Sequence, residues 1–217
     1  MKHDIKAVIF DADGTILDTR ELIYQAYRHV LSFHGYAVPD KETLFEEVRG
    51  NPAEITYAKY AIRHDPDALV DIHREFQAEH LDLWSAYEGL HDLIQKIRDA
   101  GLKIGICTSR GRNVLPMLEH IGVKDFCQAI VHGDMIVNHK PHPEPLLKVL
   151  HEMGVEASDA VMIGDTDADI GAGKAAGVAF TIGITHGVGT REILEEAGAD
   201  YVVDHLNDVL PLLTKQV

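Results

Sequence analysis

Two clusters of acidic residues each follow directly after a short apolar run. Asp11 and Asp13 come after the apolar run 7–10, and Asp165 and Asp169 come after the run 160–163. A short apolar run that stops at polar residues and glycine is typical of a buried strand. We therefore expect each cluster at the end of a strand, where carboxylates could bind Mg²⁺ and one of them could act as a nucleophile.

The spacing within each cluster suggests a division of roles. Residues two apart in an extended segment point the same way, so one carboxylate of Asp11 and Asp13 could attack while the other moves a proton. Alternatively, both are turn formers or helix caps. Asp165 and Asp169 would share one side of an opening helical turn and could bind a metal directly and through a water. The alternative is a helix N-terminus stabilised by acids, which we prefer for Asp167.

Three further residues could hold a phosphate. Lys140 is followed by prolines at 141 and 143, which stiffen the backbone. A lysine in such a loop could neutralise a carboxylate and a phosphate together, although most lysines are simply solvated. Thr108 and Ser109 follow the apolar run 103–107, so their hydroxyls and amides could bind phosphate oxygens, or could cap a helix.

The elements that position these residues alternate along most of the chain. Apolar, β-branched runs predict strands at 7–10, 103–107, 129–131, 160–163, 178–182 and 201–203. Helical patterns that end near a glycine lie between them at 90–100, 114–120 and 143–153. This alternation predicts an α/β fold with a three-layer Rossmann-like core, in which a mostly parallel sheet binds ligands at the carboxyl ends of its strands.

Residues 19–87 break the alternation. They contain helical patterns at 21–33, 42–48, 53–62 and 68–83 and no convincing strand. We therefore predict a small all-helical cap, residues 19–86, inserted into an α/β core of residues 1–18 and 87–217. Because the insert leaves the core just after the first acidic cluster, it should lie over that strand end as a lid.

Composition narrows the class of protein. The chain has 217 residues, and 20 basic against 35 acidic side chains give a formal charge of −15. This charge argues against a nucleic acid or an anionic membrane as partner. Two cysteines are too few for a disulfide framework, and no run approaches the ~20 apolar residues of a membrane span. We expect a cytoplasmic protein, either a monomer or a homodimer.

In this order, the polar segments resemble the four signature motifs of the haloacid dehalogenase superfamily of phosphohydrolases. The first motif matches Asp11-Ala12-Asp13-Gly14-Thr15, the second Thr108, the third Lys140, and the fourth Gly164-Asp165 through Asp169. The resemblance covers essentially the whole chain. Within the superfamily, the chain is most similar to helical-capped phosphoglycolate phosphatases and related pyrophosphatases.

The resemblance implies a role for each motif residue. Asp11 would attack phosphorus to give an aspartyl-phosphate, and Asp13 would protonate the leaving group and then activate water. Thr108 and Lys140 would hold the phosphoryl group, with Ser109 beside them. Mg²⁺ would be bound by Asp11, the backbone carbonyl of Asp13 and Asp165, with Asp169 completing the set of metal-site acids.

The resemblance also bears on the substrate, a small phosphorylated metabolite with phosphoglycolate or pyrophosphate as leading candidates. The cap residues Arg49 and Gly50 lie where relatives place a specificity loop. Arg49 could clamp a second anion bidentately or could be a solvated helix-end arginine, and Arg20 and Arg110 are weaker candidates. Gly164 stands where sugar-phosphate mutases carry glutamate, so hydrolysis is favoured. A mutase and a non-catalytic binding protein are the alternatives.

Overall fold

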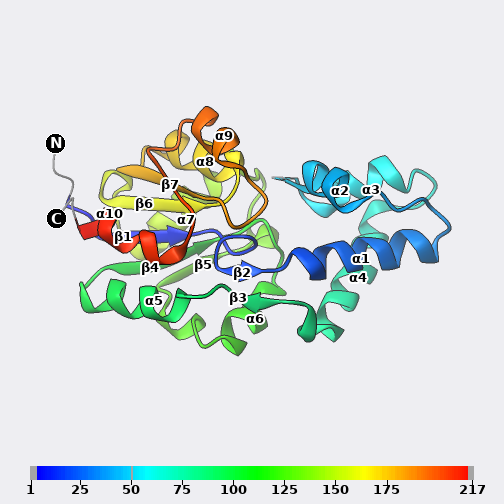
Figure 1. Ribbon diagram of the computed structural model, residues 1–217, viewed down its shortest axis with the longest axis horizontal. Coiled ribbons are helices and arrows are strands. Elements are labelled where there is room, and N and C mark those ends of the chain that lie inside the picture. The colour runs from blue at the N-terminus through cyan, green and yellow to red at the C-terminus, as the bar shows by residue number, and fades with distance from the viewer. Residues whose placement is uncertain (1–3, 50, 215–217) are drawn as a thin grey trace.

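The core is a six-stranded sheet in a computed structural model that describes residues 4–49 and 51–214 (Figure 1). The strand order is β5-β4-β1-β6-β7-β8, and every neighbouring pair is parallel. This confirms the predicted parallel sheet. The strands are β1 (Ala7–Phe10), β4 (Lys103–Cys107), β5 (Ala129–Val131), β6 (Ala160–Gly164), β7 (Phe180–Ile184) and β8 (Tyr201–Val203).

Helices cover both faces of this sheet. Because side chains alternate along a strand, Val8 and Phe10 enter one apolar cluster and Ala7 and Ile9 enter another. The first cluster takes residues from α5 (Leu90–Asp99), α6 (Val114–His120) and α10 (Leu210–Thr214). The second takes residues from α7 (Glu144–Met153), and α8 (Asp167–Ala176) packs against β6 and β7. The remaining core helix is α9 (Arg191–Glu196). The result is the predicted three-layer α/β core.

One predicted strand lies two residues away from its observed position. The apolar run 178–182 predicts a strand, but β7 covers Phe180–Ile184. Gly177 ends α8 with φ 76°, and the Val178 amide donates to the Gly173 carbonyl. These are the bonds of a left-handed helix C-cap, so Val178 still completes the helix.

Four helices form a second lobe beyond one end of the core (Figure 1). They are α1 (Arg20–Phe33), α2 (Lys41–Val48), α3 (Ala53–Tyr60) and α4 (Pro66–Glu79), and they enclose their own apolar cluster. Leu31, Leu44, Tyr57 and Leu69 are all buried there. None of the helices in residues 4–49 and 51–214 is long and apolar enough to cross a membrane.

A small antiparallel sheet joins the two lobes. Its strands β2 (Leu17–Asp18) and β3 (Ser85–Ala86) pair where the chain leaves and re-enters the core. The sequence predicts no strand here, because two residues are too few to show an alternating pattern. This pairing fixes both connections of the helical lobe side by side.

Candidate active site

Strand order brings the predicted site residues to one edge of the sheet. β1 lies between β4 and β6, and the next residues after these three strands are Asp11, Thr108 and Asp165. The Asp11 amide donates to the Ile163 carbonyl at 2.9 Å, so the hydrogen bonds between β1 and β6 extend to the backbone of Asp11. Parallel pairing therefore places residues from three distant segments side by side.

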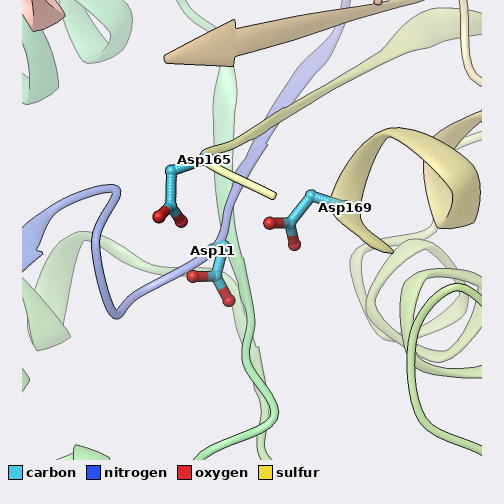
Figure 2. A group of neighbouring side chains, drawn as sticks. All are labelled: Asp11, Asp165 and Asp169. Atoms are coloured by element: carbon cyan, nitrogen blue, oxygen red, sulfur yellow. The ribbon is translucent and has the colours of Figure 1, made fainter. Parts of the chain in front are cut away.

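Three carboxylates converge at this edge. Figure 2 shows the Asp11, Asp165 and Asp169 side chains pointing toward a common centre, and one oxygen from each lies within 4.8 Å of the others. All three residues are buried. Burial and the nearby Asp169 charge raise the pKa of Asp165 to about 7, and burial likewise raises the pKa of Asp11. Such an all-oxygen set of donors fits Mg²⁺.

Lys140 is the cation that faces this cluster. Its Nζ lies 2.6 Å from Asp11 Oδ1 and 2.5 Å from Asp169 Oδ1, and it donates to the Cys107 carbonyl at 3.1 Å. Burial would lower the pKa of Lys140, but the two carboxylates outweigh burial and raise it. Only 5% of Lys140 is exposed, so the alternative of a solvated surface lysine is wrong.

Close backbone packing holds Asp165 in place. Its Oδ1 accepts from Thr15 Oγ1 at 3.1 Å, and its Oδ2 accepts from the Val188 amide at 2.9 Å. A Cβ atom on Gly14 or Gly187 would lie 2.2 or 2.0 Å from Asp165 Oδ2. Gly14 also has φ 79°, which glycine alone adopts without strain. The two glycines thus form a cradle around this carboxylate that added side chains would fill.

Asp165 and Asp169 are close for a different reason than the one predicted. Asp165 precedes the helix, whereas Asp169 is the third residue of α8, so the expected shared helical turn is wrong. Asp169 forms a capping box with Thr166, whose Oγ1 donates to Asp169 Oδ2 at 2.6 Å. Its other oxygen holds Lys140. Asp167 lies in the first helical turn with an exposed side chain, as the helix-terminus interpretation predicts.

Asp13 lies outside this carboxylate cluster and pairs with Arg110. The guanidinium donates to both Asp13 oxygens, at 2.7 and 2.6 Å, and Thr19 Oγ1 donates at 2.6 Å. Burial would raise the pKa of Asp13, but the Arg110 charge and these hydrogen bonds hold it below its usual value. Any contact of Asp13 with a metal would therefore involve its backbone carbonyl, as the resemblance implies.

A cavity of about 470 Å³ opens in front of these groups. Asp11, Asp13, Thr108, Ser109 and Lys140 all line it from the core. The helix-cap alternative for Thr108 and Ser109 is wrong, because α6 begins only at Val114. Thr108 Oγ1 accepts from the Arg110 amide at 3.1 Å, and its O–H can donate to a phosphate oxygen.

The cap contributes charged residues to the same cavity. Arg49 lines it and lies 3.7 Å from the Asp167 carboxylate, which links the cap to the core. Gly50 lies outside the described residues. Arg20 is held by two bonds to Asp18, at 2.9 and 2.8 Å. Of the two cap arginines considered for binding a second anion, Arg49 therefore has the longer contact with its carboxylate partner.

A polar chain that the sequence does not predict runs from Arg110 into the cap. Arg110 Nη1 donates to Gln77 Oε1 at 2.5 Å, Gln77 Nε2 lies 2.8 Å from His73 Nε2, and Tyr57 Oη lies 2.9 Å from His73 Nδ1. Burial and the nearby Arg110 charge lower the pKa of His73 to about 3, so the ring is neutral. The spacing of Gln77 and His73 fits one helix face, but nothing in the sequence places that face at the site.

The chain is similar to known proteins over nearly its whole length. The sequence profile of the haloacid dehalogenase-like hydrolases matches residues 8–182. A pyrophosphatase PpaX from Bacillus mycoides is 32% identical over 213 residues, covering 97% of this chain and 98% of the relative.

Two solved structures share the whole fold. A predicted phosphoglycolate phosphatase from Haemophilus somnus superposes with a TM-score of 0.85 at 17% identity, covering 97% of this chain and 98% of that one. CbbY from Rhodobacter sphaeroides, solved in complex with phosphate, gives a TM-score of 0.83 at 25% identity, covering 94% and 96%. The chain therefore belongs to the haloacid dehalogenase-like hydrolase family and is a phosphatase, hydrolysing phosphate ester or anhydride bonds.

Proposed function

We propose that this protein is a Mg²⁺-dependent phosphohydrolase that works through an aspartyl-phosphate on Asp11. The observation that carries the proposal is the buried Asp11 carboxylate. Lys140 holds its Oδ1, and no hydrogen bond from the described part of the chain reaches its Oδ2. A carboxylate fixed in this way, at the wall of a cavity, is positioned to attack a bound phosphoryl group.

Asp13 supplies the proton transfer. The first step requires the ion pair between Asp13 and Arg110 to open, so that Asp13 carries a proton. A bond then forms between Asp11 and phosphorus, the bond from phosphorus to the leaving oxygen breaks, and Asp13 gives that oxygen its proton. In the second step Asp13 takes a proton from water, the water oxygen bonds to phosphorus, and the Asp11–phosphorus bond breaks. Both carboxylates line the same cavity, as both steps require.

Charge neutralisation comes from the remaining groups. Lys140, held between Asp11 and Asp169, faces the position where phosphate charge develops. Asp11 and Asp165 would hold Mg²⁺, which supplies further positive charge to the phosphoryl oxygens when bound. Asp169 positions Lys140 through its ion pair, and the Thr108 hydroxyl, at the carboxyl end of the neighbouring strand β4, orients the phosphoryl group.

Pyrophosphate and phosphoglycolate are the first candidate substrates. The 32% identical relative is named a pyrophosphatase, and both molecules carry a second anionic group beyond the phosphate that is attacked. Arg49 can receive that group, because its 3.7 Å contact with Asp167 is longer than a hydrogen bond and easily exchanged.

Hydrolysis is favoured over phosphoryl transfer between sugar positions. A Cβ atom on Gly164 would lie 2.2 Å from the Asp169 Cβ. The glutamate typical of the mutases at this position would therefore displace Asp169 and, with it, Lys140. Formation of a sugar-phosphate isomer without release of phosphate would contradict this part of the proposal.

The test combines turnover with trapping of the intermediate. We expect Mg²⁺-dependent phosphate release by the wild-type protein and none by Asp11→Asn. Reduction with borohydride during turnover would convert an aspartyl-phosphate at position 11 into homoserine, which peptide mass spectrometry detects. Phosphate release by Asp11→Asn at the wild-type rate, or a label at another residue, would refute the assignment.

A further inference from the structure

The cavity has two chemically unlike walls. The core wall carries the carboxylates, Lys140 and Thr108 that phosphoryl transfer requires. The facing cap wall combines polar and charged residues with an apolar set, and the members of this set are Ile23, Tyr27, Phe45, Val48, Pro52, Ala53 and Val70. A phosphoryl group uses only the first wall. The second wall therefore needs an explanation of its own.

Phe45 is an aromatic side chain on this wall that does not pack into an apolar core. In α2, Leu44 is buried in the cap cluster, whereas Phe45 and Val48, three residues apart on one helix face, are half-buried and line the cavity. Val48 also packs against the cap cluster, but Phe45 belongs to none of the three apolar clusters found among the described residues. Its ring is thus available to a molecule in the cavity.

Most of the arginines that line the cavity already face carboxylates, although Arg49, which keeps only a 3.7 Å contact with Asp167, can receive an anion. Arg74 is shared between Glu54 and Asp134, at 3.9 and 3.3 Å. Arg110 is held by Asp13. A volume of about 470 Å³ falls in the range of pockets that enclose entire organic molecules. Pyrophosphate has no apolar surface to bury against this wall.

We propose that the active site accepts phosphate monoesters whose leaving group carries a flat apolar ring, and that Phe45 is the specificity-determining residue that contacts this ring. The phosphoryl end of this proposal rests on the function proposed above. Hydrolysis proceeds by the same two steps, and the phenol or alcohol oxygen leaves with the proton from Asp13. Stacking or edge contacts with the Phe45 ring favour such leaving groups over short aliphatic ones.

The test compares phenyl phosphate, methyl phosphate and pyrophosphate with the wild-type protein, Phe45→Ala and Phe33→Ala. Phe33 is a matched control, because it lies on the cap, is 76% exposed and does not line the cavity. We expect kcat/KM for phenyl phosphate to exceed that for methyl phosphate by at least about tenfold. Phe45→Ala should lower this ratio about tenfold, and Phe33→Ala should leave it within about twofold. Equal ratios in all three proteins would overturn the proposal.

A binding measurement separates this proposal from the proposed reaction. Phenylphosphonate and methylphosphonate, whose carbon–phosphorus bonds are not hydrolysed, are titrated calorimetrically into each protein with Mg²⁺ present. Tighter binding of phenylphosphonate that is lost in Phe45→Ala supports the proposal even if turnover is absent. Phosphate release from pyrophosphate together with equal binding of both phosphonates would refute the ring specificity and leave the proposed reaction intact.

Discussion

Removing the Lys140 charge should strongly destabilise the metal-free protein. In Lys140→Met, the Asp11, Asp165 and Asp169 carboxylates keep their positions within 4.8 Å of one another but lose the ammonium group that faces them. Breaking a buried ion pair by removing one partner costs about 3–5 kcal/mol, because an unpaired charge stays buried. We expect this loss in the free energy of unfolding, measured by denaturant titration at pH 7.5 with EDTA.

The pH dependence of this loss has a definite sign. Asp165 already has a folded-state pKa of about 7, above the ordinary value near 4, so the folded protein binds its proton more tightly than the unfolded chain. Its contribution is fully present below pH ~4 and is lost as the pH rises through ~7. Without Lys140 the three carboxylates repel one another more. The loss in the free energy of unfolding of Lys140→Met should therefore become smaller as the pH is lowered toward 5.

Lys174→Met is the matched control. Lys174 pairs with Asp200 at 3.1 Å, but both side chains are about 40% exposed, so its removal should cost between 0 and about 1 kcal/mol. Mg²⁺ at about 100 times its dissociation constant should restore ~2.7 kcal/mol to Lys140→Met if the site still binds it. Equal stability losses in the two variants would refute the role of Lys140 as the cation of the cluster.

Three further predictions concern the same site. Mg²⁺ affinity, measured calorimetrically, should fall up to about tenfold per pH unit below ~7, because the metal displaces a proton from Asp165. An affinity that does not change between pH 5.5 and 7.5 would contradict this. Gly14→Ala should weaken Mg²⁺ binding by roughly 10- to 100-fold, since its Cβ would meet Asp165 Oδ2. Unchanged binding would show that the backbone around Asp165 shifts without cost to the metal site. Arg110→Met should raise the pKa of Asp13 and move the limb of the kcat/KM profile that this residue controls to higher pH, and an unmoved profile would separate Arg110 from proton transfer.

Local patterns were sufficient to predict the core elements. Strands 7–10, 103–107, 129–131 and 201–203 lie where apolar runs predict them. In the central strand β1 this is because a strand buried on both faces must be apolar throughout. The four cap helices also lie within about four residues of their periodic patterns, but α4 (Pro66–Glu79) ends before the predicted pattern 68–83 does. Short features were missed, namely the two-residue strands β2 and β3, the short helices α9 and α10, and the C-cap at Gly177 that delays β7.

The sequence by itself determined which residue types stand at the strand ends and in what order, because motifs and apolar periodicity are local properties. Only the tertiary structure decided how they pair. Parallel register places Asp11 beside Asp165, and the cap brings Gln77 to Arg110, which in turn holds Asp13. It also left the Phe45 ring facing the cavity instead of a core. Such contacts join residues far apart in the chain, and the side chain that packs against a given site is set by the whole fold, not by its neighbours in sequence.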